Sequence, residues 1–190
     1  MIYNVFGPSG SGKTTFVKNL LKHKKVPLFF KEFRINKFKY KELNRVSVSL
    51  IPLPKFTGNV EELFNIFSID INILISLENE LRELSESIFD KYYGLKNLEN
   101  IACRNIETFS AGEIRRLFLL KTLLVDSEFY IVDEPFSNSD TKLWNIIYRA
   151  INRKNNIIVL SHLSLEKFFN KDENNISLHI DEVNKSFLFD

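Results

Sequence analysis

A short segment near the start of the chain has the residue types and spacing of a phosphate-binding loop. Residues 7–14 read GPSGSGKT and fit the pattern G-x-x-x-x-G-K-[ST]. Glycines let the backbone turn so that successive N–H groups face phosphate oxygens, and a following helix adds the positive potential of its N-terminus. In such a loop Lys13 reaches the β- and γ-phosphates, and the Thr14 hydroxyl ligates Mg²⁺. The segment predicts a nucleotide site, and a plain Gly–Ser turn is the alternative.

Two adjacent carboxylates follow an apolar run later in the chain. Residues 129–132 read FYIV and are followed by Asp133 and Glu134. At the end of a strand beside the phosphate loop, Asp133 can hold a Mg²⁺-bound water and Glu134 can polarise an attacking water. A polar transition from strand to loop would produce the same residues.

Three further polar groups have a structural and a functional interpretation. Ser110 and Glu113 fit S-x-x-E, the capping box that opens a helix. Asp140 follows Glu134 closely and could cap a helix, and His162 follows another apolar run. None of these groups identifies a reaction when it is taken alone.

The elements that must position these groups alternate between strand and helix. Short apolar runs predict strands at residues 2–6, 46–51, 129–132 and 157–160, and helical spacing predicts helices from Lys13 to residues 22–25 and across 60–93, 113–124 and 144–151. Residues 26–52 are expected to form strands broken by turns, and residues 176–189 a hairpin. This alternation is typical of an α/β fold with a mostly parallel sheet.

Composition narrows the class of protein. The chain has 190 residues, of which 44% are hydrophobic, one cysteine and a formal net charge of +2. These values fit one folded domain and exclude intrinsic disorder and a disulfide framework. We expect no signal peptide and no membrane span, and a charge this small does not require a nucleic-acid partner.

Together the motifs resemble the ATP-binding cassette (ABC) ATPases. Residues 7–14 resemble the Walker A loop of that family, and residues 109–113 (FSAGE) resemble its signature, usually LSGGQ. Residues 131–135 (IVDEP) resemble the Walker B strand with its glutamate, residues 137–140 (SNSD) resemble the D-loop, and His162 stands at the switch histidine. The five motifs occur in the family's order.

The resemblance implies a P-loop NTPase core over residues 1–190 with a mostly parallel sheet, an inserted helical subdomain at about residues 60–125 and a C-terminal hairpin. It implies ATP and Mg²⁺ as ligands, with Glu134, His162 and Lys13 as catalytic groups and Thr14 and Asp133 at the metal. The nucleotide-binding residues that it implies are Gly7, Pro8, Ser9, Gly10, Ser11, Gly12, Lys13, Thr14, Thr15, Ser110, Gly112 and Asp140.

The resemblance also implies partners. Two such domains pair head to tail, as a homodimer or with a second ATPase subunit, and drive separate transmembrane subunits from the cytoplasmic face of the membrane. Nucleic acid is not expected as a partner. The surface that docks the membrane subunits is expected within residues 52–100.

Several positions depart from the family pattern. Walker A begins at Gly7, so we expect a domain that is shortened at its N-terminus and lacks the family's adenine-stacking aromatic residue at its usual place. Leu53 stands where the family has the Q-loop glutamine, and leucine cannot ligate Mg²⁺ or its water. In the signature, Ala111 replaces a glycine and Glu113 replaces the glutamine.

Three alternatives to a transport ATPase remain. The chain could be a soluble ABC-type ATPase that acts on a ribosome, a nucleic acid or a protein assembly. It could be a degenerate cassette that binds nucleotide and hydrolyses it poorly, or a P-loop kinase with a small acceptor.

Overall fold

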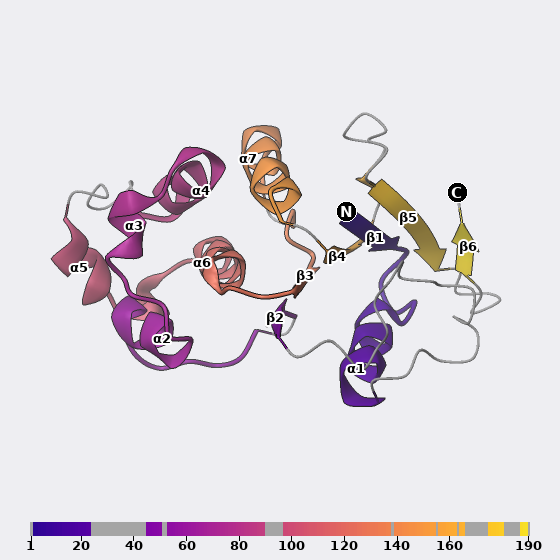
Figure 1. The fold of residues 1–190 in the computed structure, drawn as a ribbon, viewed down its shortest axis with the longest axis horizontal. Coiled ribbons are helices and arrows are strands. Elements are labelled where there is room, and N and C mark those ends of the chain that lie inside the picture. Colours follow the sequence, from indigo (N-terminus) through magenta and orange to yellow (C-terminus); the bar gives the residue numbers. More distant parts are fainter. Residues whose placement is uncertain are drawn as a thin grey trace. The chain divides into compact units, whose positions relative to one another are not determined.

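The computed structural model describes residues 2–23, 45–50, 53–89, 97–137, 139–154, 156–162, 164–165, 175–180 and 187–189. The chain divides into two compact units. The sheet unit comprises Met1–Ile51, Ser127–Glu134 and Asn155–Asp190, and the helical unit comprises Pro52–Asp126 and Pro135–Lys154. Each unit is therefore built from segments that are far apart in the sequence (Figure 1).

The sheet unit contains a six-stranded sheet with the order β2-β3-β4-β1-β5-β6. All neighbouring strands are parallel except β5 and β6, which are antiparallel. The strands β3, β4 and β1, which precede the predicted site residues, are neighbours in the sheet, so their carboxyl ends meet at one edge. The strands are β1 (Ile2–Phe6), β2 (Val46–Ser49), β3 (Phe129–Asp133), β4 (Ile157–Ser161), β5 (Asn175–Ile180) and β6 (Phe187–Phe189).

Apolar side chains fix this arrangement because β3 and β4 are buried along their whole length. Helix α1 (Lys13–His23) packs Phe16 and Val17 against one face of the sheet. The side chains that form this core with them are Tyr3, Val5, Phe129, Ile131, Ile158 and Leu160. The predicted α/β fold with a mostly parallel sheet is confirmed, as is the C-terminal hairpin of β5 and β6. Most of the predicted strand region at 26–52 lies outside the described residues; within it, β2 is present.

The helical unit contains α2 (Val60–Ile66), α3 (Ile73–Ser76), α4 (Asn79–Phe89), α5 (Leu98–Ala102), a 3₁₀ turn at Ile106–Thr108, α6 (Ala111–Leu124) and α7 (Thr141–Asn152). Helix α4 packs against both α6 and α7 (Figure 1). The buried side chains of the helical unit include Leu63, Phe64, Leu84, Ile88, Leu117 and Leu120. The unit holds the helices of the predicted insertion and also α7.

The helical region predicted at 60–93 is interrupted at positions that neither glycine nor proline marks. Ser68 and Asn79 have positive φ values of 56° and 52°, and Leu77 is extended at the end of α3. Serine and asparagine tolerate such backbone better than branched residues do. The apolar residues at helical spacing in this region nevertheless include several buried ones, namely Leu74, Leu77, Leu84 and Ile88. Within the described residues, no helix is both long and apolar enough to cross a bilayer.

Candidate active site

The loop between β1 and α1 has the backbone that residues 7–14 predict. Gly10 and Gly12 have φ values of 84° and 97°, in the region that favours glycine. No atom lies within 4 Å of a Cβ placed on Gly12, so the backbone conformation, not crowding, requires glycine there. The Gly7 N–H donates to Ser161 O (3.2 Å), and the Ser11 N–H donates to Pro8 O (3.3 Å). The loop is thereby tied to the end of β4 and closed on itself.

The ammonium group of Lys13 is held inside this loop. Its Nζ donates to Gly7 O (2.7 Å) and Pro8 O (2.9 Å), and the residue is 6% exposed. Two carbonyl groups therefore fix a positive charge at the mouth of a turn whose N–H groups favour an anion. This is the environment in which a lysine binds phosphate.

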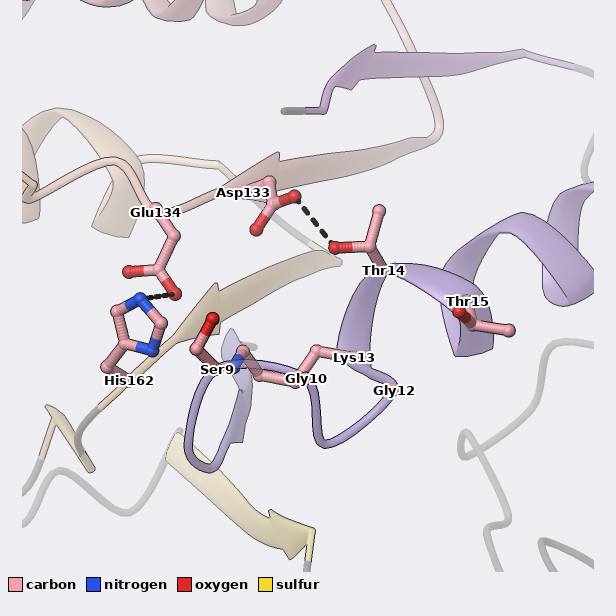
Figure 2. A pocket seen from close by; sticks show the side chains of 9 residues that line it. All are labelled: Ser9, Gly10, Gly12, Lys13, Thr14, Thr15, Asp133, Glu134 and His162. Carbon is pink, nitrogen blue, oxygen red and sulfur yellow. Dashed lines mark hydrogen bonds and ion pairs between the residues drawn. The ribbon is translucent and has the colours of Figure 1, made fainter. Parts of the chain in front are cut away.

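Thr14 and Asp133 bring a hydroxyl and a carboxylate together from distant parts of the chain. Thr14 Oγ1 donates to Asp133 Oδ2 (3.1 Å), and Asp133 is buried at the end of β3 (Figure 2). Hard oxygen ligands of this kind suit Mg²⁺, which usually takes one or two protein ligands and completes its shell with phosphate and water. The described residues contain no cluster of three or more His, Cys, Asp or Glu side chains that could hold a metal ion.

Glu134 has an unusual backbone for a residue with a side chain. Its φ is 48°, and its N–H donates to Leu160 O (2.8 Å). Strained conformations of this kind concentrate at functional sites, where the surroundings hold them in place. The bend directs the carboxylate toward His162, whose Nε2 lies 3.4 Å from Glu134 Oε1 (Figure 2).

The surroundings of Glu134 raise the pKa of its carboxyl group. Burial raises the pKa of the Glu134 carboxyl above its ordinary value, and the Asp133 carboxylate adds to the increase. The charges of His162 and Lys13 act in the opposite direction. A carboxylate with a raised pKa beside a histidine is a suitable group to orient a water molecule and take up its proton.

All of these groups line one pocket of about 280 Å³ within the sheet unit (Figure 2). The pocket collects predicted residues from the ends of β1, β3 and β4 and from the start of α1. Its lining comprises Ser9, Gly10, Gly12, Lys13, Thr14, Thr15, Asp133, Glu134 and His162. Gly7, Pro8 and Ser11 do not line it, but they shape the loop that does.

The other predicted nucleotide-binding residues lie in the helical unit. Ser110 caps α6, with its Oγ accepting from the Glu113 N–H (3.3 Å) while Glu113 Oε2 accepts from the Ser110 N–H (2.7 Å). Asp140 caps α7 by accepting from the Leu143 N–H (2.8 Å). A Cβ on Gly112 would have one neighbour, Arg116, at 3.4 Å, and Ser110 and Ala111 are exposed, so this side of the first turn of α6 is open.

The Glu113 carboxyl at the start of α6 has a lowered pKa. Burial alone would raise the pKa of the Glu113 carboxyl, but hydrogen bonds from Ser110 and the charges of Arg104 and Arg116 outweigh burial and lower it. Glu113 is therefore a carboxylate at neutral pH. The capping interpretation of S-x-x-E is confirmed, and it is compatible with a role of Ser110 in binding.

The sequence interpretation missed a buried polar residue close to the site. Asn4 in β1 is 1% exposed and forms a hydrogen bond with Ser161 (2.9 Å), the residue before His162. The signal that could have found it is a single amide within an otherwise apolar strand. Leu53, the residue at the Q-loop position, is partly buried in the helical unit and brings no oxygen ligand.

Comparison with known proteins agrees with these motifs. The sequence profile described as "ABC transporter" matches residues 1–137. The chain is 30% identical over 164 residues to the sublancin-168-processing and transport ATP-binding protein SunT of Bacillus subtilis, covering 82% of this chain and 22% of SunT. It is 28% identical over 149 residues to the Fe(3+) ions import ATP-binding protein FbpC of Fusobacterium nucleatum, covering 74% of this chain and 37% of FbpC.

Solved structures share the fold. The archaeal ribosome recycling factor aABCE1, solved with the stalk protein aP1, superimposes with a TM-score of 0.61 at 22% identity. The match covers 100% of this chain and 38% of that one, and at this identity it supports the fold alone. The described chain corresponds to a minor part of each of these three proteins. With the profile matching well over half of its residues, the chain belongs to the ABC transporter family.

Proposed function

We propose that the pocket binds ATP with Mg²⁺ and hydrolyses the bond to the γ-phosphate. The observation that carries this proposal is the convergence of Lys13, the Thr14–Asp133 pair and the Glu134–His162 pair on one pocket. Each of these groups has a separate task in phosphoryl transfer. A chance collection of polar residues would not supply every one of these tasks. Mg²⁺, when bound, neutralises charge on the triphosphate.

The residues of the pocket act mainly by position and charge. Lys13 and the loop N–H groups hold the phosphates, and Thr14 and Asp133 hold the metal and its water. Glu134 orients a water molecule toward the γ-phosphorus and accepts its proton as the bond to the leaving ADP oxygen breaks. His162 holds Glu134 and contacts the γ-phosphate. Preorganised groups of this kind typically contribute orders of magnitude in rate.

The proposed working form is a head-to-tail pair. The open first turn of α6, with Ser110 and Gly112, is available to contact a nucleotide held by a second ATPase subunit, and Asp140 belongs to the same contact. A helix N-terminus with a hydroxyl favours phosphate. Two copies of this chain, or this chain and a related subunit, would each contribute one half of every site.

We further propose that hydrolysis drives transport through separate membrane subunits at the cytoplasmic face. The relatives that support this are a processing and transport protein and an Fe(3+) import protein. The alternative of a ribosome-associated ATPase draws on a fold likeness at 22% identity, which does not distinguish functions. The intact pocket argues against the degenerate cassette, and the motifs at Ser110 and Asp140 argue against the kinase.

Replacing the proposed catalytic carboxylate tests hydrolysis directly. Glu134→Gln keeps the size and the hydrogen-bonding ability of the side chain but removes the base, so ATP still binds and steady-state turnover falls by at least about 100-fold. The matched control is Glu78→Gln, an exposed carboxylate of the helical unit, which leaves turnover unchanged. Turnover of Glu134→Gln close to that of the unchanged protein would remove Glu134 from this role.

A further inference from the structure

A single amide lies in the middle of the apolar strand β1. Asn4 is 1% exposed, and its neighbours Tyr3 and Val5 belong to the apolar core. It is paired in register with Val159 of β4. A buried amide is costly unless its donors and acceptor are all satisfied, so its contacts show what it holds.

The Asn4 amide satisfies three groups at once. In the one orientation that fits them all, its Oδ1 accepts from the Leu165 N–H (2.8 Å), and its Nδ2 donates to Ser161 Oγ (2.9 Å) and Val159 O (3.3 Å). Two of these contacts lie on either side of His162 in the sequence. The amide therefore ties both ends of the turn that carries His162 to the centre of the sheet.

The same turn is anchored to the other parts of the pocket through the backbone. Ser161 O accepts from the N–H of Gly7 at the start of the phosphate loop (3.2 Å). Leu160 O accepts from the N–H of Glu134 (2.8 Å). Residues 160–161 thus meet the phosphate loop, Glu134 and the Asn4 amide, and a shift of this segment would move His162 relative to Glu134.

We infer that Asn4 is a positioning residue for hydrolysis, which holds the His162 turn in register with the phosphate loop through Ser161 and Leu165. This inference rests on the proposed function of the pocket. A leucine at this position would fill similar space and leave the Leu165 N–H and the Ser161 hydroxyl without this partner. An aspartate would place a carboxylate against Val159 O.

The test is a double-mutant cycle between Asn4→Leu and His162→Ala. Asn4→Leu should lower kcat by about 10- to 100-fold, the cost of a misplaced catalytic group, while ATP affinity stays within about threefold. In the His162→Ala background, Asn4→Leu should change kcat by less than about twofold, because the group that it positions is already absent. Equal losses in both backgrounds, or an unchanged kcat in folded Asn4→Leu, would overturn the inference.

Three further measurements keep the outcomes separate. Ser161→Ala removes one amide contact with little change in volume and should give a smaller loss of kcat with the same dependence on His162, even if Asn4→Leu fails to fold. Ser47→Ala, at another buried polar position of the sheet, should leave kcat unchanged. The ring-proton NMR signal of His162 should shift in Asn4→Leu. Failure of the unchanged protein to hydrolyse ATP would count against the proposed function, whereas an unmoved His162 signal would count against the role of Asn4.

Discussion

Lys121 is a buried charge in the last turn of α6. The residue is 3% exposed, and its Nζ lies 3.9 Å from the ring centroid of Phe67 and 6.0 Å from that of Phe118. Aromatic faces stabilise an ammonium group only in part, and burial lowers the pKa of Lys121 to about 8. The folded protein therefore bears a free-energy cost at neutral pH to keep this side chain charged.

The sign of this effect gives a pH-dependent prediction. Between about pH 8 and pH 10.5 the unfolded chain holds a proton on Lys121 that the folded chain has released, so this residue makes stability rise with pH. Lys121→Met should raise the free energy of unfolding at pH 7 by roughly 1–3 kcal/mol. That gain should be lost as the pH increases from about 8 to about 10.5.

Urea unfolding of both proteins at several pH values measures the difference. The control is Lys142→Met, an exposed position of α7, which should change stability by less than about 0.5 kcal/mol. A Lys121→Met protein that is less stable than the unchanged one at pH 7 would show that the interactions of the Lys121 ammonium group outweigh the desolvation cost.

At the scale of residues, the pocket was predictable because its chemistry is local in sequence. The loop at residues 7–14 and the Asp133–Glu134 pair are short contiguous motifs that can be recognised from sequence. The structure brings them together with His162. The partners of the Asn4 amide and the positive φ of Glu134 were not predictable. A lone amide in an apolar strand signals a buried polar residue but not what it contacts, and the backbone of Glu134 depends on the hydrogen bond to Leu160.

Two helices of the helical unit, α2 and α6, begin with a capping box. Comparing the two boxes separates the contribution of a cap to stability from a role in nucleotide binding. Asn59 and Glu62 form a capping box at α2 with distances of 2.8 and 2.9 Å, and Ser110 and Glu113 form one at α6. Each side chain satisfies backbone N–H groups that would otherwise lack a partner. Only the box of α6 lies in the motif proposed to contact nucleotide.

Alanine substitutions at the two caps should both lower stability, but only one of them should weaken dimer formation. Asn59→Ala and Ser110→Ala should each lower the free energy of unfolding by about 1 kcal/mol without nucleotide. In the Glu134→Gln background, only Ser110→Ala should raise the MgATP concentration needed for dimer formation, because only Ser110 is proposed to contact the nucleotide of the second subunit. Urea unfolding and light scattering measure the two effects. Equal MgATP requirements for both variants would leave Ser110 with a capping role alone.

At the scale of elements, types were easier to predict than boundaries. Helix α6 begins at Ala111, close to the predicted start at Glu113, because the capping box marks it. The breaks before α3 and α4 depend on Ser68 and Asn79 adopting positive φ, and neither glycine nor proline marks them. The hairpin predicted at residues 176–189 is present as the antiparallel pair β5 and β6.

At the scale of the whole molecule, the motifs divide between the two units. The sheet unit holds the phosphate loop, Asp133, Glu134 and His162, whereas the helical unit holds Ser110, Gly112 and Asp140. The sequence order of the motifs predicted the family, but no spacing in a single chain reveals which copy completes which site. We therefore propose that two ATPase subunits close on ATP.

The most direct test is the mass of Glu134→Gln in solution, measured by light scattering with and without MgATP. Because this variant binds ATP without consuming it, it should accumulate the closed state. We expect a change from 22.3 kDa to twice that mass on addition of MgATP, and no change with ATP and excess EDTA. A protein that binds MgATP and stays at 22.3 kDa at concentrations far above its ATP dissociation constant would contradict closure between two copies of this chain.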